Sequence, residues 1–412
     1  MRLNSGTLCA PMNRLSKNEI ETYTTPQYTF ISTSEGFRKA LEHIGSVPRL
    51  AIDIEADSLY HYFEKVCLIQ ISSDSKTFIL DSLKLKGIKT LAPLMSDSSV
   101  EKVFHAPSYD FYCLRRDYGF SFRNIFDTHI AAQLLGYAFL GLGALMEELL
   151  GIRHSKRRQR DDWSRRPLRQ EQLEYAAMDT RHLLPLRDTL EKELKQKGRL
   201  GWAIEEFETS VTVERLPKEF NTEGFRRIKG CRDLCLQEQT MLRALYILRD
   251  RIARELDVPP FKAMNNAVLV DLVERPPKNS KELFHRSGIS YRIARKYASD
   301  IVQTIRQAQR QDPHSQQPTT RNNWKPTNLE TRNRMAALRS WRKNKAKELD
   351  LHVGVVFPAI LLENLAEAPP ADLEGLKNLE GMRQWRVQEF GKELIELLHN
   401  HGRQADPNST RA

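Results

Sequence analysis

The chain has 412 residues, 40% of them hydrophobic, and carries a formal net charge of +11 at pH 7. This length allows two to four domains with sizeable cores, and the lack of any apolar run of membrane-spanning length excludes an integral membrane protein. Because residues 1–17 contain no signal-peptide core and the five cysteines are scattered, we expect a cytoplasmic protein with reduced thiols.

Mixed strand and helix patterns follow an N-terminal extension of residues 1–27 and continue to about residue 200. We therefore predict an α/β domain over residues 28–210. Ser34 is the expected N-cap of its first helix, and Asp127 is read as the N-cap of a later helix, worth about 1 kcal/mol, and not as a ligand. The predicted strands are 28–32, 50–54, 66–72, 77–80 and 102–105, and the predicted helices are 34–44, 109–118, 128–135 and one that includes 171–179.

Asp53 and Glu55 are the first candidate site residues. They lie two residues apart at the end of an expected buried strand, so their side chains point to the same face. Two adjacent carboxylates raise each other's pKa unless a cation lies between them, and a hard divalent cation with oxygen ligands is the usual solution. These two residues alone fit a metal site and a solvated strand-end acid equally well.

Two helices supply further candidates. Asp110 lies early in its helix, five residues after His105, and Tyr175 and Asp179 share one face of a later helix. A phenol and a carboxylate on one face can simply hydrogen-bond at a surface. Four carboxylates from three elements, however, can surround two cations about 3.5–4 Å apart and clamp the oxygens of a phosphodiester. The sequence alone does not prove that they converge.

These residues carry a resemblance to a known family. Asp53-x-Glu55, Asp110 after His105, and Tyr175-x-x-x-Asp179 resemble the three exonuclease motifs of the DEDD superfamily in its tyrosine-bearing branch. The flanking segments resemble ribonuclease D in particular. Ala106 departs from the wider superfamily, in which an asparagine often follows the histidine of the second motif. The resembling flanks are residues 64–71, 126–128, 162–168 and 175–186.

The resemblance implies a ribonuclease H-like exonuclease domain, a mixed sheet with flanking helices, whose four carboxylates hold two Mg²⁺ or Mn²⁺ ions. Tyr175 has an ordinary pKa near 10 and is a poor base at neutral pH. We therefore expect its hydroxyl chiefly to orient a metal-bound water. His105 is expected to contact the nucleic acid.

A basic segment over residues 153–166 precedes the last helix of this domain. Arginine binds phosphates bidentately and stacks on bases, so we predict that this segment contacts RNA. Trp163 within it can stack on an unpaired base or pack into the core beside Pro167, and we favour packing. The expected RNA contacts are Lys156, Arg157, Arg158 and Arg160.

The second half contains an internal repeat with a constant spacing, since 338 − 245 = 93 and 381 − 288 = 93. Helical periodicity broken by proline pairs and by Gly288 or Gly381 predicts two copies of a small helical bundle. The copies resemble HRDC domains, the helicase-and-ribonuclease-D C-terminal fold. We expect a first HRDC domain at 235–310, a linker at 311–330, a second HRDC-like domain at 331–401 and a disordered tail at 402–412.

Charge is unevenly distributed along the chain. Basic minus acidic residues give 9 − 13 = −4 for 51–150, 14 − 8 = +6 for 151–200, 21 − 10 = +11 for 251–350 and 4 − 8 = −4 for 351–400. This pattern favours a metal-bearing centre flanked by phosphate-binding surfaces, although solvated faces would look similar. We expect only the first HRDC domain to bind a polyanion, and the second to be a spacer or packing partner. The candidate RNA contacts in the first are Lys278, Lys281, Arg292, Arg295 and Lys296.

Taken together, the resemblance implies a metal-dependent 3′–5′ exoribonuclease that acts on structured RNA with an unpaired 3′ end, such as a tRNA precursor, and releases nucleoside 5′-monophosphates. We expect no membrane association and no obligate protein partner. One alternative is a DNA exonuclease of the same fold, because no residue in the sequence can be identified as a contact to a ribose 2′-hydroxyl. Another is a non-catalytic RNA-binding scaffold, against which all four carboxylates and the tyrosine are present.

Overall fold

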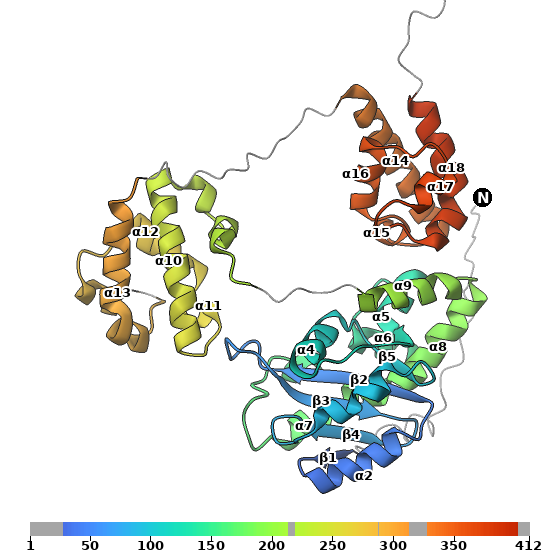
Figure 1. The fold of residues 1–412 in the computed structure, drawn as a ribbon, viewed down its shortest axis with the longest axis horizontal. Helices are drawn as coiled ribbons and strands as arrows, with labels where there is room; N and C mark the ends of the chain where they lie inside the picture. The colour runs from blue at the N-terminus through green and yellow to red at the C-terminus, as the bar shows by residue number, and fades with distance from the viewer. Residues whose placement is uncertain (1–27, 213–218, 287, 313–327, 403–412) are drawn as a thin grey trace, which may run out of the picture.

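The computed structural model describes residues 28–212, 219–286, 288–312 and 328–402 (Figure 1). A mixed sheet with flanking helices is followed by two all-helical modules, which confirms the predicted fold class. The predicted N-terminal extension, most of the linker and nearly all of the tail lie outside the described residues. Within the described ranges, no helix is long and apolar enough to cross a membrane.

The first domain is built on a six-stranded sheet in the order β1-β4-β3-β2-β5-β6. The strand β2 lies inside this sheet, antiparallel to β3 and parallel to β5. Every residue of β3 is buried, as expected for a strand covered on both faces. The strands are β1 Thr29–Ile31, β2 Arg49–Ala56, β3 Val66–Ser72, β4 Thr77–Asp81, β5 Glu101–Phe104 and β6 Ile125–Asp127.

Helices of the first domain begin close to the predicted positions. The N-cap of α2 is Thr33 and not Ser34 as predicted, because Thr33 has the extended backbone of a cap and its side chain accepts a hydrogen bond from the Gly36 N–H. Asp127 caps α5 as predicted. The helices are α2 Ser34–Ile44, η1 Ile88–Leu91, α3 Ala92–Ser96, α4 Ser108–Tyr118, α5 Thr128–Leu135, α6 Leu142–Leu150, η2 Lys156–Arg158, α7 Gln170–Arg181, α8 Leu183–Gln196 and α9 Leu200–Thr212.

The two helical modules repeat the same succession of elements. Residues with a left-handed backbone recur 93 positions apart, Asp257 (φ 47°) with Asp350 (φ 53°) and Gly288 (φ 84°) with Gly381 (φ 81°). This agreement extends the sequence repeat to the backbone. After η3 Thr222–Arg227 and η4 Cys231–Asp233, the first module contains α10 Leu236–Glu255, α11 Pro260–Ala263, α12 Asn266–Glu274, η5 Ser280–His285 and α13 Tyr291–Gln309, and the second contains α14 Leu329–Leu349, α15 Val353–Val356, α16 Ala359–Glu367, α17 Leu373–Lys377 and α18 Gln384–Gly402.

The first module contacts the loop between β2 and β3. The Asp257 carboxylate accepts hydrogen bonds from the backbone N–H groups of Tyr62 (3.1 Å) and Phe63 (3.0 Å), and His61 Nδ1 lies 2.8 Å from it. The Tyr62 hydroxyl also donates to Asp250. The loop connects β2, the strand that carries Asp53 and Glu55, to β3, so the first module is attached to the α/β domain next to the end of that strand.

The second module packs against the α/β domain through α9. The Trp202 ring of α9 stacks on the Trp385 ring of α18 with centroids 4.4 Å apart, and the Trp385 indole N–H donates to Glu206. Arg386 forms an ion pair with the same glutamate at 2.8 Å. Apolar residues of both parts form one hydrophobic core. The second module is therefore a packing partner of the α/β domain, on a different side from the first module (Figure 1).

Candidate active site

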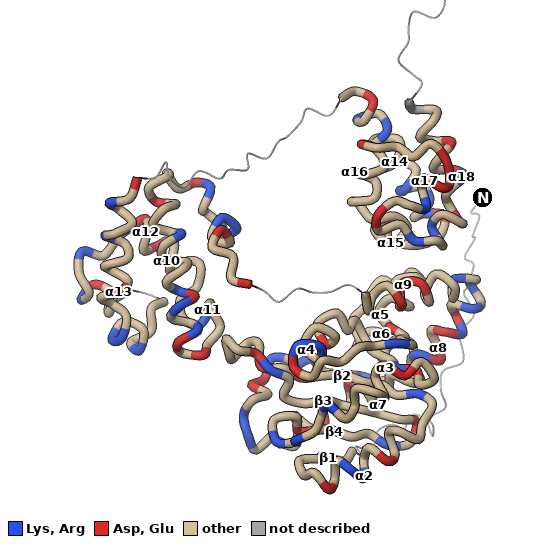
Figure 2. The backbone as a smooth tube through the Cα atoms, in the orientation of Figure 1, with Lys and Arg blue, Asp and Glu red and all other residues tan. Residues whose placement is uncertain are grey.

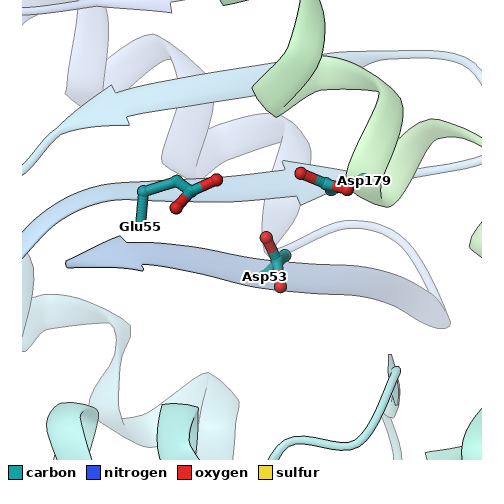
Figure 3. Close-up of side chains that lie close together, drawn as sticks. All are labelled: Asp53, Glu55 and Asp179. Atoms are coloured by element: carbon teal, nitrogen blue, oxygen red, sulfur yellow. The ribbon is translucent and has the colours of Figure 1, made fainter. Parts of the chain in front are cut away.

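Three of the four predicted carboxylates meet where β2 passes α7. Oxygen atoms of Asp53, Glu55 and Asp179 lie within 4.8 Å of one another. Figure 3 shows the three side chains close together, two from β2 and one from α7. Asp110, from α4, lines the same pocket, which has a volume of about 400 Å³. The structure thus brings together all four predicted ligands, with Asp110 outside the closest group.

The local fold explains this convergence. Asp53 and Glu55 are two residues apart on β2, so their side chains lie on the same face. The pairing of β2 with β3 shifts register between Glu55 and Ala56, an irregularity that redirects side chains at the strand end. The helix α7 packs on β2, β3 and β4. A hydrogen bond of 2.7 Å between the Ser72 and Thr180 hydroxyls anchors α7 to β3 and so places Asp179 over β2.

A second turn positions Asp110. Ala106 has a left-handed backbone (φ 55°) just before α4 begins at Ser108. The Asp127 carboxylate accepts hydrogen bonds of 2.9 Å from the backbone N–H groups of Ala106 and His129. Asp127 therefore caps α5 and also holds the turn that leads into the Asp110 helix. The Ala106 departure noted in the sequence lies at this strained position.

Burial and mutual repulsion perturb the acidic cluster. Burial, and then the neighbouring carboxylates, raises the pKa of Asp53 and of Glu55 well above the ordinary values. Burial, followed by Asp127 and Asp179, raises the pKa of Asp110 to about 7. Hard carboxylate oxygens in this arrangement fit Mg²⁺ or Mn²⁺, because a divalent cation offsets the repulsion that otherwise favours protons.

The Tyr175 ring lies near two other rings beside this cluster. Its centroid is 5.1 Å from that of His154, in a stacked arrangement, and 6.1 Å from that of Trp163. Burial and then the nearby carboxylates, Asp179 foremost, raise the pKa of Tyr175 far above its ordinary value. The hydroxyl therefore stays protonated at neutral pH and acts as a hydrogen-bond donor, which fits the orienting role expected from the sequence.

Trp163 is buried in a small hydrophobic cluster with residues of β3 and α7. The packing interpretation of this residue is therefore correct. It supports the Tyr175 ring from inside the domain and has 1% of its surface exposed, too little for stacking on a base.

His154 is a site residue that sequence reasoning missed. Its Nε2 atom lies 2.8 Å from Oδ1 of Asp179, and the side chain is 6% exposed. In the sequence it stands among arginines and lysines and has no local pattern that separates it from them. Only the packing of its segment against α7 brings it to Asp179, 25 positions further along the chain.

The predicted nucleic-acid contacts of the α/β domain divide into two groups. His105 and Lys156 line the pocket, whereas Arg157 and Arg160 are exposed outside its lining. Arg158 also lies outside and forms ion pairs with Asp161 and Glu171. The pocket therefore receives one of the four predicted cations.

His105 and Lys156 occupy defined positions in the pocket. His105 Nδ1 lies 2.9 Å from the Thr128 hydroxyl, and burial lowers the pKa of His105 to about 3, so its ring is neutral. The Lys156 ammonium lies 3.2 Å from the position that a Cβ atom on Gly141 would take. A side chain at position 141 would compete with this ammonium for space.

The five predicted cations of the first module are exposed, and Lys296 forms an ion pair of 2.6 Å with Glu255. Figure 2 shows basic positions around α13, whereas basic and acidic positions are interspersed over the second module. The +11 of residues 251–350 does not belong to the first module alone, because α14 contributes part of it. With the predicted boundaries the net charges are 14 − 8 = +6 for residues 235–310 and 11 − 10 = +1 for residues 331–401.

Comparison with known proteins places these features in context. Residues 28–195 match a family model described as a 3′–5′ exonuclease, and residues 238–305 and 332–398 each match the HRDC domain. The chain is 27% identical over 384 residues to the ribonuclease D of Nitrobacter hamburgensis, covering 90% of this chain and 94% of that protein.

Two solved structures are also similar. The catalytic core of RRP6 from Trypanosoma brucei has a TM-score of 0.65 and 26% identity, covering 72% of this chain and 81% of that one. RNase D from Escherichia coli, described as an exoribonuclease involved in structured RNA processing, has a TM-score of 0.64 and covers 91% of this chain and 99% of that one. At 23% identity, the second likeness concerns the fold alone.

Proposed function

The chain is a ribonuclease D-like 3′–5′ exoribonuclease, and from this premise we propose that it trims structured RNA with an unpaired 3′ end by two-metal-ion hydrolysis. The observation that carries the proposal is the convergence of four carboxylates and one phenolic hydroxyl in a single pocket. A tRNA precursor in the cytoplasm is the substrate that we propose.

Five residues of the pocket take part in the chemistry of this reaction. Asp53, Glu55, Asp110 and Asp179 would hold two Mg²⁺ or Mn²⁺ ions. When bound, these ions make a water more acidic and stabilise the leaving 3′ oxygen. The Tyr175 hydroxyl orients the attacking water, whose oxygen bonds to phosphorus as the bond from phosphorus to the 3′ oxygen breaks. The product is a nucleoside 5′-monophosphate and an RNA shorter by one nucleotide.

Two further residues of the pocket, Lys156 and His105, bind the substrate. The Lys156 ammonium, on the wall formed by Gly141, binds a backbone phosphate of the terminal nucleotides. The neutral His105 ring forms another part of the wall and contacts the terminal nucleotide without adding a charge. The pocket volume of about 400 Å³ is that of a small-ligand site, which supports the entry of one unpaired 3′-terminal nucleotide at a time.

The function is tested with RNA and DNA oligonucleotides of one sequence. Each is labelled at its 5′ end and incubated with and without Mg²⁺, beside a tRNA that carries extra 3′ nucleotides. We expect a ladder of RNAs shortened by one nucleotide at a time, only with metal, and trimming of the tRNA tail down to its paired stem. Equal degradation of the DNA, or products without added metal, would contradict the proposal.

We expect the first helical module to supply additional RNA affinity. Replacing Lys278, Lys281, Arg292, Arg295 and Lys296 by glutamine should weaken the binding of tRNA-sized RNA. The slope of log affinity against log salt should flatten by up to about 0.9 for each lost contact to a duplex phosphate. Lys296 should contribute least because Glu255 already neutralises it. Hydrolysis of a very short oligonucleotide should hardly change.

The matched control removes five exposed cations from the second module, at Arg332, Arg339, Lys343, Lys347 and Lys392. If this control variant loses as much RNA affinity as the first variant, and its salt dependence flattens as much, then RNA affinity depends on total charge and not on the first module. Deleting the second module is not a clean control, because it would uncover the Trp202 ring that now stacks on Trp385.

A further inference from the structure

His154 makes two contacts at once to residues of the candidate active site. Its Nε2 atom lies 2.8 Å from Oδ1 of Asp179, and its ring stacks on Tyr175 at an interplanar angle of 25°. The side chain is 6% exposed and lines the pocket. One residue from outside the three sequence motifs therefore touches both a predicted metal ligand and the predicted water-orienting hydroxyl.

The contact to Asp179 orients a carboxylate. A hydrogen bond from the imidazole N–H to one oxygen restricts the rotation of the Asp179 side chain and leaves the other oxygen for an ion. Residues that orient metal ligands in this way typically affect metal affinity by about 10- to 100-fold. The Nε2 atom of His154 is engaged with Oδ1 of Asp179 at hydrogen-bond distance, so His154 acts on a predicted ligand and not directly on an ion.

The contact to Tyr175 restricts a ring. The His154 ring stacks on Tyr175 and the buried Trp163 ring lies 6.1 Å from it, so the two neighbouring rings limit the space available to the phenol. Tyr175 precedes Asp179 by one turn of α7, and both residues line the pocket. The same histidine therefore limits the positions of both groups that would flank the attacking water.

The backbone of His154 is itself held in place. Its carbonyl oxygen lies 3.1 Å from the position that a Cβ atom on Gly143 would take, at the start of α6. Any larger residue at position 143 would push this segment away from the helix. The neighbouring Gly141 accommodates Lys156 in a similar way. Gly143 therefore lets the backbone of the segment that carries His154 approach α6 closely, and Gly141 leaves room for the Lys156 side chain.

On these observations, which rest on the proposed function, we propose that His154 is a positioning residue that holds Asp179 for metal binding and the Tyr175 ring for orientation of the attacking water. Its two actions are separable, because the hydrogen bond uses the N–H group and the stacking uses the ring face. Neither action requires the histidine to touch the substrate.

Two substitutions separate the two actions. His154→Gln retains an N–H donor at a similar reach and loses the ring, whereas His154→Phe retains a stacking ring and loses the donor. Binding of Mn²⁺ to the full chain without RNA is measured by electron paramagnetic resonance, which counts free Mn²⁺. Single-turnover hydrolysis is measured at saturating metal, and thermal unfolding shows whether each variant is folded.

We expect His154→Phe to weaken Mn²⁺ binding by about 10- to 100-fold. His154→Gln should bind Mn²⁺ nearly as the wild type does, yet hydrolyse RNA more slowly at saturating metal because the Tyr175 ring is less restricted. Wild-type Mn²⁺ affinity in His154→Phe, or equal losses in both folded variants, would overturn the proposal. If the wild type itself neither binds Mn²⁺ nor hydrolyses RNA, the proposed function fails instead.

Discussion

Asp53→Asn is expected to abolish hydrolysis and to leave RNA binding largely intact. The amide keeps the shape of the side chain but removes one charge from the closest group of ligand atoms, so two divalent cations are no longer held. The exposed cations that bind phosphates lie elsewhere and keep their charge. Single-turnover hydrolysis and equilibrium binding of the same RNA are the two measurements.

The same variant should be more stable than the wild type when both lack metal. Burial raises the pKa of Asp53 in the folded state, so this group favours folding below its unfolded pKa and loses that contribution as pH rises through its folded pKa. Above that range the wild type contains a buried charge that the amide avoids. We expect the metal-free variant to unfold at a higher temperature than the wild type at pH 8, with a smaller difference at pH 5.

Added Mg²⁺ should reverse that order, because it stabilises only the protein that binds it. Asp233→Asn, at an exposed aspartate of the first module, is the matched control and should change none of these measurements. Hydrolysis by Asp53→Asn at close to the wild-type rate would refute the assignment of the metal site.

The candidate site could be predicted from the sequence in part. The period of two along a strand brings Asp53 and Glu55 to one face, and this inference needs no tertiary information. The proximity of these two residues to Asp179 depends on the packing of α7 over three strands, and local sequence patterns do not predict that packing. Here the order of the motifs, known from the resemblance, supplied what periodicity lacks.

Contacts that depend only on packing escaped prediction. His154 reaches Asp179 because Gly143 lets its segment approach α6, and a sequence shows such a glycine without showing what it faces. The cap of α2 shows a smaller limit, since Thr33 and Ser34 are adjacent, serine is the slightly better capping residue, and only the backbone conformation shows that Thr33 is the cap. The charge of the helical modules was misjudged for another reason, because a fixed window crossed the start of α14.

The substitution Tyr175→Phe is expected to reduce the single-turnover rate by about 10²–10⁴-fold, the range typical of a positioned proton-handling group. The change removes only the hydroxyl, and the ring should remain near His154 and Trp163. Affinities for RNA and for Mn²⁺ should therefore stay close to those of the wild type. Unchanged Mn²⁺ binding separates this variant from His154→Phe, in which the ligand itself is disturbed.

The pH dependence of this loss distinguishes an orienting hydroxyl from a base. Burial, the largest cause, raises the pKa of Tyr175, and bound cations offset only the further contribution of the carboxylates, so we expect the hydroxyl to be protonated at pH 7 and at pH 9. If the hydroxyl only orients the water, its removal should slow hydrolysis by the same factor at pH 7 and at pH 9. The ratio of the wild-type rate to the variant rate should therefore be constant. A phenolate base would make that ratio rise with pH, because the active form would become more populated. An unchanged rate at both values would mean that Tyr175 only packs against its neighbours.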